Sequence, residues 1–518
     1  MEKKIQILWV DDEIALLKPY IIFLEEKGFK LSTATNGDDA IHLVTENDFD
    51  LIFLDENMPG MSGLEVLAEI KSMKPFIPVV MITKSEEENI MEEAIGSKIA
   101  DYLIKPVNPN QILLTIKKNI EKKKLVNQKT TSSYQSQFGQ LSMEINSARS
   151  FNDWQQIYRK IVYWELELQT TSDSAMDEVL ISQKEEANRE FSRFMIRNYD
   201  KWFGSGEAED KPLLSPSVFT KKVFPLLQND EKVFFILIDN LRFDQWKVLE
   251  KDLLDFSKLE EEDLYCSILP TATQYARNAM FSGLMPKEIH KLYPNLWVFD
   301  EEEGGKNLKE RELLEKQLSR AGINVSYNYE KVSNQRTGKK LVDSVSNLLN
   351  YDLNVIIYNF VDMLSHARTD MEMIRELADN EASYRSLTSS WFRHSYLLEL
   401  LKQLSGNNIK VILTTDHGSI KVENPVKVVG DKRTSSNLRY KLGRNLNYKS
   451  SEVYEIRDPD SIHLPKPNIS SSFIFAKQND FFVYPNNYNH FVNYYKNTFQ
   501  HGGVSMEEML IPLITLTI

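Results

Sequence analysis

Strand-sized apolar runs that end in an acidic, hydroxyl or basic residue recur along the chain, and they restrict its fold more than any other feature. In the first 120 residues they occur at 5–10, 31–35, 51–55, 78–83 and 100–105. Amphipathic stretches lie between them, and a further helix is expected at 108–124. This alternation predicts an α/β domain with a parallel, doubly wound sheet. Function in such sheets lies at the carboxyl ends of the strands.

The same alternation returns after residue 213. Three near-continuous apolar runs there are typical of strands buried on both faces, and they occupy 233–239, 354–362 and 410–416. The sequence therefore predicts a second, larger α/β domain.

Residues 140–203 contain neither a strand-like run nor a proline. Apolar side chains recur there at helical spacing, at Trp154, Ile157, Ile161, Trp164 and Leu168. This spacing predicts a small helical bundle. The polar stretch that begins at residue 121 is expected to be a flexible joint or an extension of the preceding helix, and 204–212 a second boundary. The expected domains are 1–122, 123–210 and 211–518.

Length, net charge and the cysteine count exclude several classes of protein and of metal site. A length of 518 residues fits about three domains at roughly 100–200 residues each. The net charge of -13 argues against general coating of nucleic acid. A single cysteine excludes an internal disulfide and a cysteine-clustered zinc site, so any metal must be held by histidines and carboxylates. The apolar runs are too short for a signal peptide or a membrane helix, so we expect a cytoplasmic protein without membrane insertion.

The strand ends of the first domain bring together chemically active residue types. Asp11 and Asp12 follow the first strand, Asp55 ends the third, Thr83 the fourth and Lys105 the fifth. Clustered carboxylates favour a hard cation such as Mg²⁺. An aspartate beside Mg²⁺ can accept a phosphoryl group, whose oxygens a lysine and a hydroxyl then bind.

This constellation resembles the CheY-like receiver domain, through the segments VDDE, LDENMPGMSG and LIKPV. The resemblance implies that Asp55 is the phosphoacceptor and that Thr83, Tyr102 and Lys105 form the switch. It also implies a cis Lys105–Pro106 bond and an Mg²⁺ site formed by Asp11, Asp12, Asp55 and Asn57. Phosphorylation adds negative charge and commonly drives dimerisation, so a phosphorylation-dependent homodimer is expected.

Acids and histidines also cluster in the pattern of the larger domain. Each of its three apolar runs ends in aspartate, and imidazoles follow closely, which gives the set Asp239, Asp362, His366, Asp416, His417 and His501. Asp362 and His366 have the i, i+4 spacing that places two side chains on one helical face. Carboxylates with imidazoles suit Zn²⁺, and two such groups make a bimetallic site for phosphoryl displacement.

A nucleophile is expected where the segment 267–283 turns at Pro270 and enters a helix. Thr271 or Thr273 would lie at the N-terminus of that helix, where backbone N–H groups favour an anion. Thr271 with Gln274 also fits a capping box, so both threonines stay open. Arg277 is expected to face the same phosphate.

The segments ILIDNLRFDQW, LPTATQYARNAMFSG, VDMLSHA, TTDHG and QHGG occur in this order and resemble the PglZ branch of the alkaline-phosphatase superfamily, over about 215–518. The resemblance implies a two-zinc phosphodiesterase. One metal would be held by Asp239, the threonine nucleophile, Asp416 and His417, and the other by Asp362, His366 and His501. Counting back from Ser282–Gly283 favours Thr273 as that nucleophile, whereas the capping pattern places Thr271 nearest the strand end.

A basic stretch follows His417. It comprises Lys421, Lys427, Lys432, Arg433, Arg439, Lys441, Arg444 and Lys449, with Tyr440 and Tyr448 interleaved. It predicts either a solvated face or a cationic funnel for a phosphate-rich substrate.

The order of the three domains resembles the PorX-type response regulators. That resemblance implies a sensor histidine kinase partner, contact with a sigma factor or the secretion motor, cyclic or linear oligonucleotides as substrate, and a role in type IX secretion and gliding. The leading hypothesis is a phosphorylation-controlled zinc phosphodiesterase. The alternatives are a catalytically weak module that binds a nucleotide or a protein, and a DNA-binding regulator. The acidic composition and the lack of a terminal helix-turn-helix disfavour the last.

Overall fold

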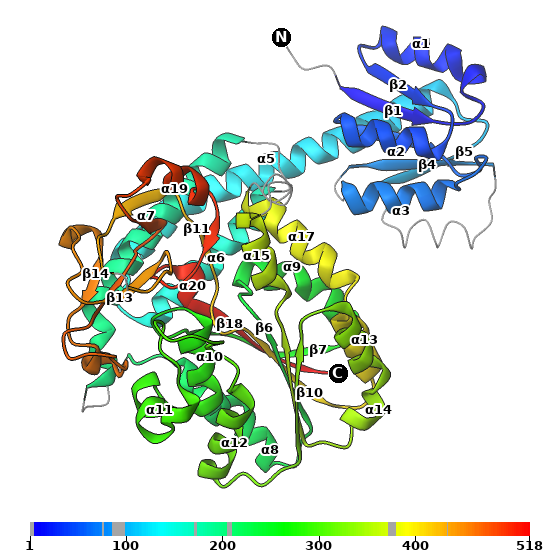
Figure 1. Ribbon diagram of the computed structural model, residues 1–518. Coiled ribbons are helices and arrows are strands. Elements are labelled where there is room, and N and C mark those ends of the chain that lie inside the picture. Colours follow the sequence, from blue (N-terminus) through cyan, green and yellow to red (C-terminus); the bar gives the residue numbers. More distant parts are fainter. Residues whose placement is uncertain are drawn as a thin grey trace. The chain divides into compact units, whose positions relative to one another are not determined.

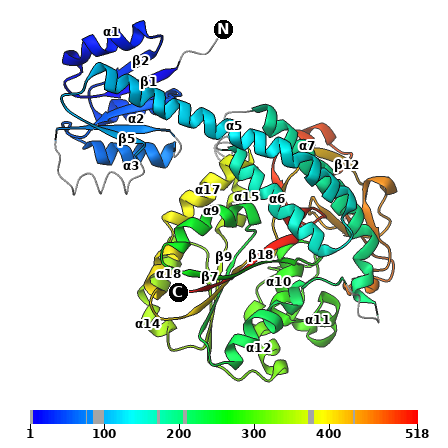
Figure 2. The ribbon, with the colours of Figure 1, turned by 180° about the vertical axis from the view of Figure 1, so that it is seen from behind.

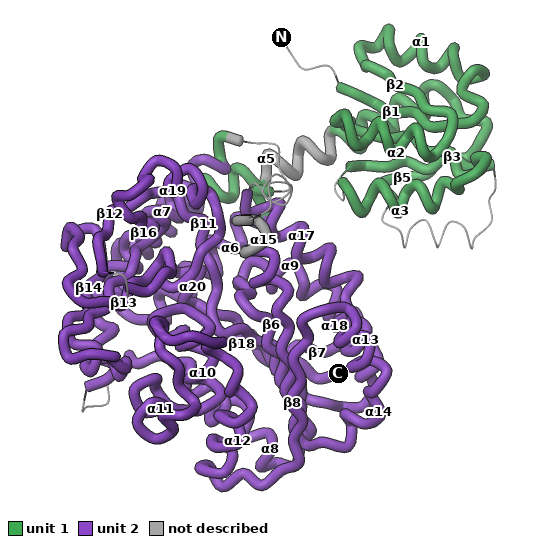
Figure 3. The backbone as a smooth tube through the Cα atoms, in the orientation of Figure 1, with its two compact units in different colours: residues 1–136, 167–176 green, residues 137–166, 177–518 purple. Residues whose placement is uncertain are grey.

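The chain folds into two compact units, residues 1–136 with 167–176 and residues 137–166 with 177–518 (Figure 3). The computed structural model describes residues 5–74, 77–84, 99–169, 174–204, 210–370, 380–431 and 434–518. Side chains at 121–129, 174 and 366–370 are outside this description.

The first unit contains a five-stranded sheet in the order β2-β1-β3-β4-β5. Its strands are Gln6–Val10 (β1), Lys30–Ala34 (β2), Leu51–Asp55 (β3), Val79–Thr83 (β4) and Asp101–Ile104 (β5). All neighbours pair in parallel, which confirms the predicted doubly wound sheet. The helices are Lys18–Glu26 (α1), Gly37–Glu46 (α2) and Gly63–Met73 (α3), with the start of a long helix, Pro109–Ser147 (α5). Separate apolar cores lie on the two faces of the sheet.

Three long helices form the middle of the chain, Pro109–Ser147 (α5), Phe151–Gln169 (α6) and Ser174–Asn198 (α7). Of the two alternatives for the polar stretch that begins at residue 121, the extension of the preceding helix is confirmed, because α5 continues through it to Ser147. The stretch 121–138 contains neither glycine nor proline, so nothing in it stops helix propagation. The side chains predicted as the core of this region are buried, namely Trp154, Ile157, Ile161, Trp164 and Leu168.

The second unit contains a six-stranded sheet in the order β7-β18-β10-β6-β9-β8 (Figure 1). Its strands are Val233–Ile238 (β6), Lys258–Cys266 (β7), Tyr327–Val332 (β8), Leu353–Tyr358 (β9), Lys410–Thr414 (β10) and Leu510–Thr517 (β18). Strands β10, β6, β9 and β8 pair in parallel, whereas β18 runs antiparallel to both β10 and β7. Every residue of β6 and β9 is buried, as their continuous apolar runs predict.

Helices cover both faces of this sheet, with α10 and α12 on one side and α9, α17 and α18 on the other (Figures 1 and 2). The helices are Phe224–Gln228 (α8), Phe243–Leu254 (α9), Thr273–Ser282 (α10), Pro286–Leu292 (α11), Glu310–Ala321 (α12), Gln335–Asp343 (α13), Val345–Leu348 (α14), Phe360–Asp370 (α15), Glu381–Arg393 (α17), Tyr396–Leu404 (α18), Tyr488–Tyr495 (α19) and Met506–Met509 (α20). No helix in the described part of the chain combines the length and the apolar character needed to cross a bilayer.

Three small sheets follow the fifth strand of the larger sheet along the chain. Their strands are Ile420–Lys421 (β11) with Phe499–Gln500 (β17), Asn424–Lys427 (β12) with Asp480–Val483 (β16), and Tyr440–Gly443 (β13), Tyr454–Ile456 (β14) and Ser472–Phe475 (β15). The basic stretch predicted from the sequence falls within this region.

Two expectations need correction. The strand expected to reach Asp362 ends at Tyr358, and Asp362 lies in the first turn of α15. Hydropathy alone cannot separate a short strand from the start of a helix, because both read as an apolar run.

The basic stretch is not a row of surface cations, because Arg439 and Lys441 are buried. Lys432 and Arg433 lie outside the described residues.

Candidate active site and phosphoacceptor site

The strand register places the acids of the first unit together. Val10 pairs with Leu54, so Asp11 and Asp55 follow at the same level of neighbouring strands. Ligand oxygens of Asp11, Asp12 and Asp55 all lie within 4.8 Å of one another. Asp11 and Asp55 are buried, whereas Asp12 is exposed. Oxygen donors crowded in this way fit a hard cation such as Mg²⁺.

Lys105 reaches this cluster from the end of β5. Its Nζ donates to Asp11 Oδ2 at 2.8 Å and to Asp55 Oδ2 at 3.0 Å. Burial alone would lower the pKa of Lys105, but the hydrogen bonds to the two carboxylates outweigh it and raise that pKa. Burial raises the pKa of Asp55, and the hydrogen bond from Lys105 offsets part of this effect. The lysine stays charged where a phosphoryl group would add negative charge.

The remaining residues predicted for the switch border the same edge. Thr83 is buried at the end of β4, Tyr102 is half-buried on β5, and the Lys105–Pro106 bond is cis. Asn57 is exposed in the loop after β3. A side chain at Gly63 would place its Cβ 2.3 Å from the Asp55 carbonyl oxygen, so only glycine lets α3 begin this close to the acid.

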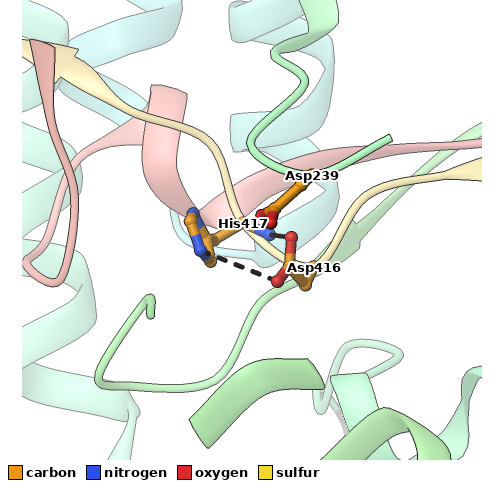
Figure 4. A group of neighbouring side chains, drawn as sticks. All are labelled: Asp239, Asp416 and His417. Carbon is orange, nitrogen blue, oxygen red and sulfur yellow. Dashed lines mark hydrogen bonds and ion pairs between the residues drawn. The ribbon is translucent and has the colours of Figure 1, made fainter. Parts of the chain in front are cut away.

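Register also explains the acidic cluster of the second unit. Thr414 of β10 pairs with Leu237 of β6, so Asp416 and Asp239 lie side by side two residues beyond the pair. His417 follows at once, and ligand atoms of Asp239, Asp416 and His417 lie within 4.8 Å of one another. Figure 4 shows the three side chains converging from the ends of the two strands. All three are buried.

These side chains fit a metal ion. Asp239 Oδ1 is buried and has no hydrogen-bond partner among the described residues. Leaving a buried carboxylate oxygen unsatisfied is costly, and a cation in contact with it would remove that cost. Carboxylate and imidazole donors without a cysteine suit zinc.

A second group of candidate metal ligands, which includes His501 and Asp362, lies next to Asp239, Asp416 and His417. The His501 and His417 rings stack with centroids 4.2 Å apart. His501 Nε2 lies 3.9 Å from Asp362 Oδ1, and its Nδ1 is 3.1 Å from the Thr271 carbonyl oxygen. His366 belongs to the same helix as Asp362, and its side chain lies outside the described part of the structure. The structure thus brings Asp362 and His501 beside Asp239, Asp416 and His417.

The two candidate threonines differ in their contacts. Thr271 Oγ1 donates to the Gly503 carbonyl and accepts from the Gly502 N–H, both at 3.0 Å. Thr273 is the first residue of α10, and its Oγ1 lies 3.1 Å from His417 Nε2. Two ligands of one tetrahedral zinc at about 2.0–2.1 Å would be separated by roughly 3.3 Å. The Thr273 hydroxyl has this spacing from His417, whereas the Thr271 hydroxyl is occupied by backbone groups.

Arg277 lies one turn further along α10 and contacts carboxylates. Its Nη2 is 2.5 Å from Asp239 Oδ2, its Nε 2.9 Å from Asp416 Oδ2, and its Nη1 3.4 Å from Glu310 Oε1. Burial acts to raise the pKa of Asp416, but the charges of Arg277 and His417 outweigh it and lower that pKa. Burial raises the pKa of Asp239 well above its usual range, although Arg277 opposes this. The guanidinium balances acids that would otherwise repel one another.

Neither a solvated face nor a cationic funnel describes Arg439 and Lys441 of the basic stretch, because both are buried. Arg439 forms a buried ion pair with Glu508, its Nη2 2.5 Å from Oε2. Lys441 Nζ donates to the Ser435 carbonyl, and burial lowers its pKa to about 8. The two interleaved tyrosine hydroxyls are bonded to acids, Tyr440 to Asp300 and Tyr448 to Glu455. These side chains stabilise the small sheets.

Three segments of the chain match known protein families. Residues 7–117 match the family described as response regulator receiver domain, and residues 124–203 the PorX response regulator linker domain. Residues 218–516, more than half of the chain, match the BREX system PglZ alkaline phosphatase-like domain. A receiver domain is a substrate of sensor kinases, and an alkaline-phosphatase-like domain belongs to a superfamily of hydrolases.

Similar individual proteins cover short parts of the chain. The alginate biosynthesis transcriptional regulatory protein AlgB of Pseudomonas syringae is 36% identical over 124 residues, 24% of this chain and 28% of that protein. The transcriptional regulatory protein ResD of Bacillus subtilis is 36% identical over 112 residues, 22% of this chain and 46% of that protein. The chain thus spans less than half the length of these two curated relatives.

Among solved structures, a CheY-like receiver domain protein from Methanospirillum hungatei is 26% identical, with a TM-score of 0.23, and covers 23% of this chain and 96% of its own. Chemotaxis response regulator CheY4 of Vibrio cholerae is 28% identical, with a TM-score of 0.22, and covers 23% of this chain and 99% of its own. From its family matches, the chain belongs to the PglZ alkaline-phosphatase-like family, as a response regulator of the PorX type.

Proposed function

We propose that this protein is a metal-dependent phosphodiesterase that hydrolyses cyclic or linear oligonucleotides under the control of phosphorylation at Asp55. The observation that carries the proposal is the convergence of Asp239, Asp416 and His417 with Thr273, beside the pair Asp362 and His501. The proposed domains of the protein are the receiver at 1–122, the helical middle at 123–210 and the PglZ domain at 211–518.

Asp239, Asp416, His417 and Thr273 would hold one zinc ion, and Asp362, His366 and His501 the other. Two zinc ions bound there would lower the pKa of the Thr273 hydroxyl and stabilise the attacking and leaving oxygens of the diester. In the receiver, Asp11, Asp12, Asp55 and the Asn57 carbonyl would hold Mg²⁺.

Thr273 is the nucleophile in this proposal. The hydroxyl gives its proton to solvent, and its oxygen bonds to phosphorus while the bond between phosphorus and the leaving nucleotide oxygen breaks. That oxygen takes a proton from solvent and leaves as an alcohol. Water then hydrolyses the phosphothreonine, which regenerates the hydroxyl. The N-terminus of α10 supports the step, because the positive end of a helix favours the anionic phosphate. Arg277 keeps Asp239 and Asp416 in place and adds positive charge beside the phosphate.

We further propose, from the match of the middle segment to the PorX linker, that a sensor histidine kinase phosphorylates the receiver and that the output controls type IX secretion and gliding. A sigma factor and a component of the secretion motor are the proposed protein partners. Phosphorylation would produce a homodimer in the cytoplasm.

A second candidate is a module that binds a nucleotide or a partner without turnover. The observation that favours it is Arg277, because this buried cation already neutralises two of the acids proposed as metal ligands.

Measured hydrolysis of a short oligonucleotide by the purified full chain distinguishes the phosphodiesterase from the module that binds without turnover. Removal of metal with a chelator is expected to abolish hydrolysis, and added zinc to restore it, because the nucleophile depends on metal for activation. Rates that do not change after the chelator would contradict the metal-dependent reaction. Bound zinc without turnover would favour the binding module.

A further inference from the structure

We propose that helix α7 of the middle segment supports the candidate active site through one residue, Asn188, which positions His501 through Glu507. The segment 501–509, called here the His501 loop, carries His501 into the site and then enters the last strand of the sheet. The inference rests on the proposed function, since it treats His501 as a metal ligand. Asn188 is a positioning residue, because it acts on the site through another residue.

Asn188 binds the His501 loop at two points. Its Nδ2 donates to the Glu507 carboxylate, at 3.0 Å to Oε2 and 3.2 Å to Oε1. Its Oδ1 accepts from the Met506 N–H at 2.8 Å. Asn188 is 4% exposed and Glu507 is 1% exposed, so water cannot replace these bonds freely. A buried carboxylate that loses a hydrogen-bond donor is destabilised, so loss of the Asn188 amide would favour movement of the loop.

Two further residues of α7 contact the same loop. Lys184 Nζ lies 3.1 Å from Glu507 Oε1, and Ser192 Oγ donates to the Val504 carbonyl at 3.4 Å. Lys184 also pairs with Glu165 and Glu381, both at 2.8 Å, so its removal would disturb more than the loop. Asn188 is the more specific residue to replace, because the side-chain hydrogen bonds it makes within the described part of the chain are all with the His501 loop.

The other side of the loop is fixed independently of α7. Glu508 accepts from the Gly503 N–H at 2.9 Å and from Ser505 Oγ at 2.7 Å, and it forms the buried ion pair with Arg439. Thr271 bonds both the Gly502 N–H and the Gly503 carbonyl. The loop is therefore held from two sides, and α7 provides one of them.

The contacts of Glu507 and Glu508 reach the residues next to His417 and close to His501. Gly418, which follows His417, packs against the loop so closely that a Cβ there would lie 2.0 Å from the Glu507 carbonyl oxygen. The Gly418 N–H also donates to the Glu508 carbonyl at 3.3 Å. His501 at the other end of the loop stacks on His417. A displaced Glu507 would therefore shift His501 relative to Asp362 and disturb the His417 turn.

The test compares three variants of the full chain with wild type. Asn188→Leu keeps the size of the side chain and removes both polar contacts. Asn188→Asp combined with Glu507→Gln exchanges donor and acceptor, so that the amide of residue 507 donates to the new carboxylate and the charge of the pair is kept. Gln183→Leu is the matched control, because Gln183 is a buried residue of the same helix that bonds Phe138 and Ser142 instead of the loop.

Asn188→Leu is expected to lower kcat for a short oligonucleotide by about 10–100-fold, the usual effect of losing a partner that orients a metal ligand. Zinc content is expected to fall from two ions toward one, with KM little changed. The exchanged pair is expected to recover kcat to within about threefold of wild type. Gln183→Leu is expected to leave zinc content and kcat unchanged.

The inference is overturned if Asn188→Leu keeps both zinc ions and its kcat, if Gln183→Leu loses as much as Asn188→Leu, or if the exchanged pair stays as impaired as Asn188→Leu. Wild-type protein with two zinc ions and no turnover would refute the phosphodiesterase alone, and zinc content would then decide the role of α7. Wild-type protein that binds no zinc would refute both proposals.

Discussion

Thr273→Val is expected to reduce oligonucleotide hydrolysis by at least about 10³-fold, because removal of a nucleophile leaves only the contribution of binding and electrostatics. Valine has the shape of threonine without the hydroxyl that lies 3.1 Å from His417 Nε2. Initial rates of the zinc-loaded full chain, measured at saturating substrate, check the expectation. The fold of the Thr273→Val variant is expected to be intact, because the Thr273 hydroxyl bonds only His417 among the described residues.

Thr271→Val is the matched control for that experiment. The Thr271 hydroxyl bonds the backbone of Gly502 and Gly503, so its loss leaves a buried N–H and a carbonyl without partners. The free energy of unfolding is expected to fall by about 1–3 kcal/mol, with kcat of the folded protein within about tenfold of wild type. Urea titration together with the same rate measurement distinguishes the two roles. Loss of turnover in Thr271→Val with turnover kept in Thr273→Val would reverse the assignment of the nucleophile.

Asp55→Asn is expected to abolish phosphoryl transfer to the chain altogether. An amide oxygen is too poor a nucleophile to accept a phosphoryl group, whereas the buried Asp55 carboxylate lies against Lys105 and Asp11 at the end of β3. Incubation with acetyl phosphate and Mg²⁺, followed by intact-mass measurement, reports the added phosphate directly. The proposed homodimer, measured by light scattering after the same incubation, is expected for wild type and not for the variant.

Asp101→Asn provides the control for the receiver. Asp101 begins β5 and pairs with Lys118 at 2.8 Å, outside the acidic cluster. The substitution is expected to leave phosphorylation and dimer formation unchanged. Persistent labelling of Asp55→Asn would place the acceptor elsewhere, and labelling lost equally in Asp101→Asn would point to general damage of the fold.

The sequence predicts the parts of both sites that strand periodicity determines. Asp11, Asp55, Asp239 and Asp416 each follow a buried apolar run, and neighbouring parallel strands end at the same edge of a sheet. Residue type and position along the chain are then enough to expect the acids to meet.

Features set by loops and helix starts are harder to predict. Asp362 belongs to the first turn of α15, and the apolar residues before it do not reveal where strand gives way to helix. The choice between Thr271 and Thr273 depends on which hydroxyl is hydrogen-bonded to the backbone near Gly502. That backbone segment is far from both threonines in the sequence. The basic stretch predicts Arg439 on a cationic surface, but Arg439 is buried against Glu508. The local sequence does not reveal this, because Glu508 lies 69 residues further along the chain.

Glu507 and Asn188 were missed for the same reason. Two glutamates after HGG resemble an exposed helix start, and an asparagine in a charged helix resembles a surface residue. A signal does exist in the sequence, because SMEEM is followed directly by an eight-residue strand that has to be buried. Acids so close to a buried strand need partners, and the partners come from α7 and from the small sheets.

Anomalous diffraction at the zinc edge, from crystals of the zinc-loaded full chain, tests the central claim most directly. Two peaks about 3.5–4 Å apart are predicted, one within about 2.0–2.2 Å of ligand atoms of Asp239, Asp416, His417 and Thr273. The other is predicted at Asp362, His366 and His501. Peaks elsewhere in the chain, or no peak at either of these two ligand sets, would contradict the proposed bimetallic site.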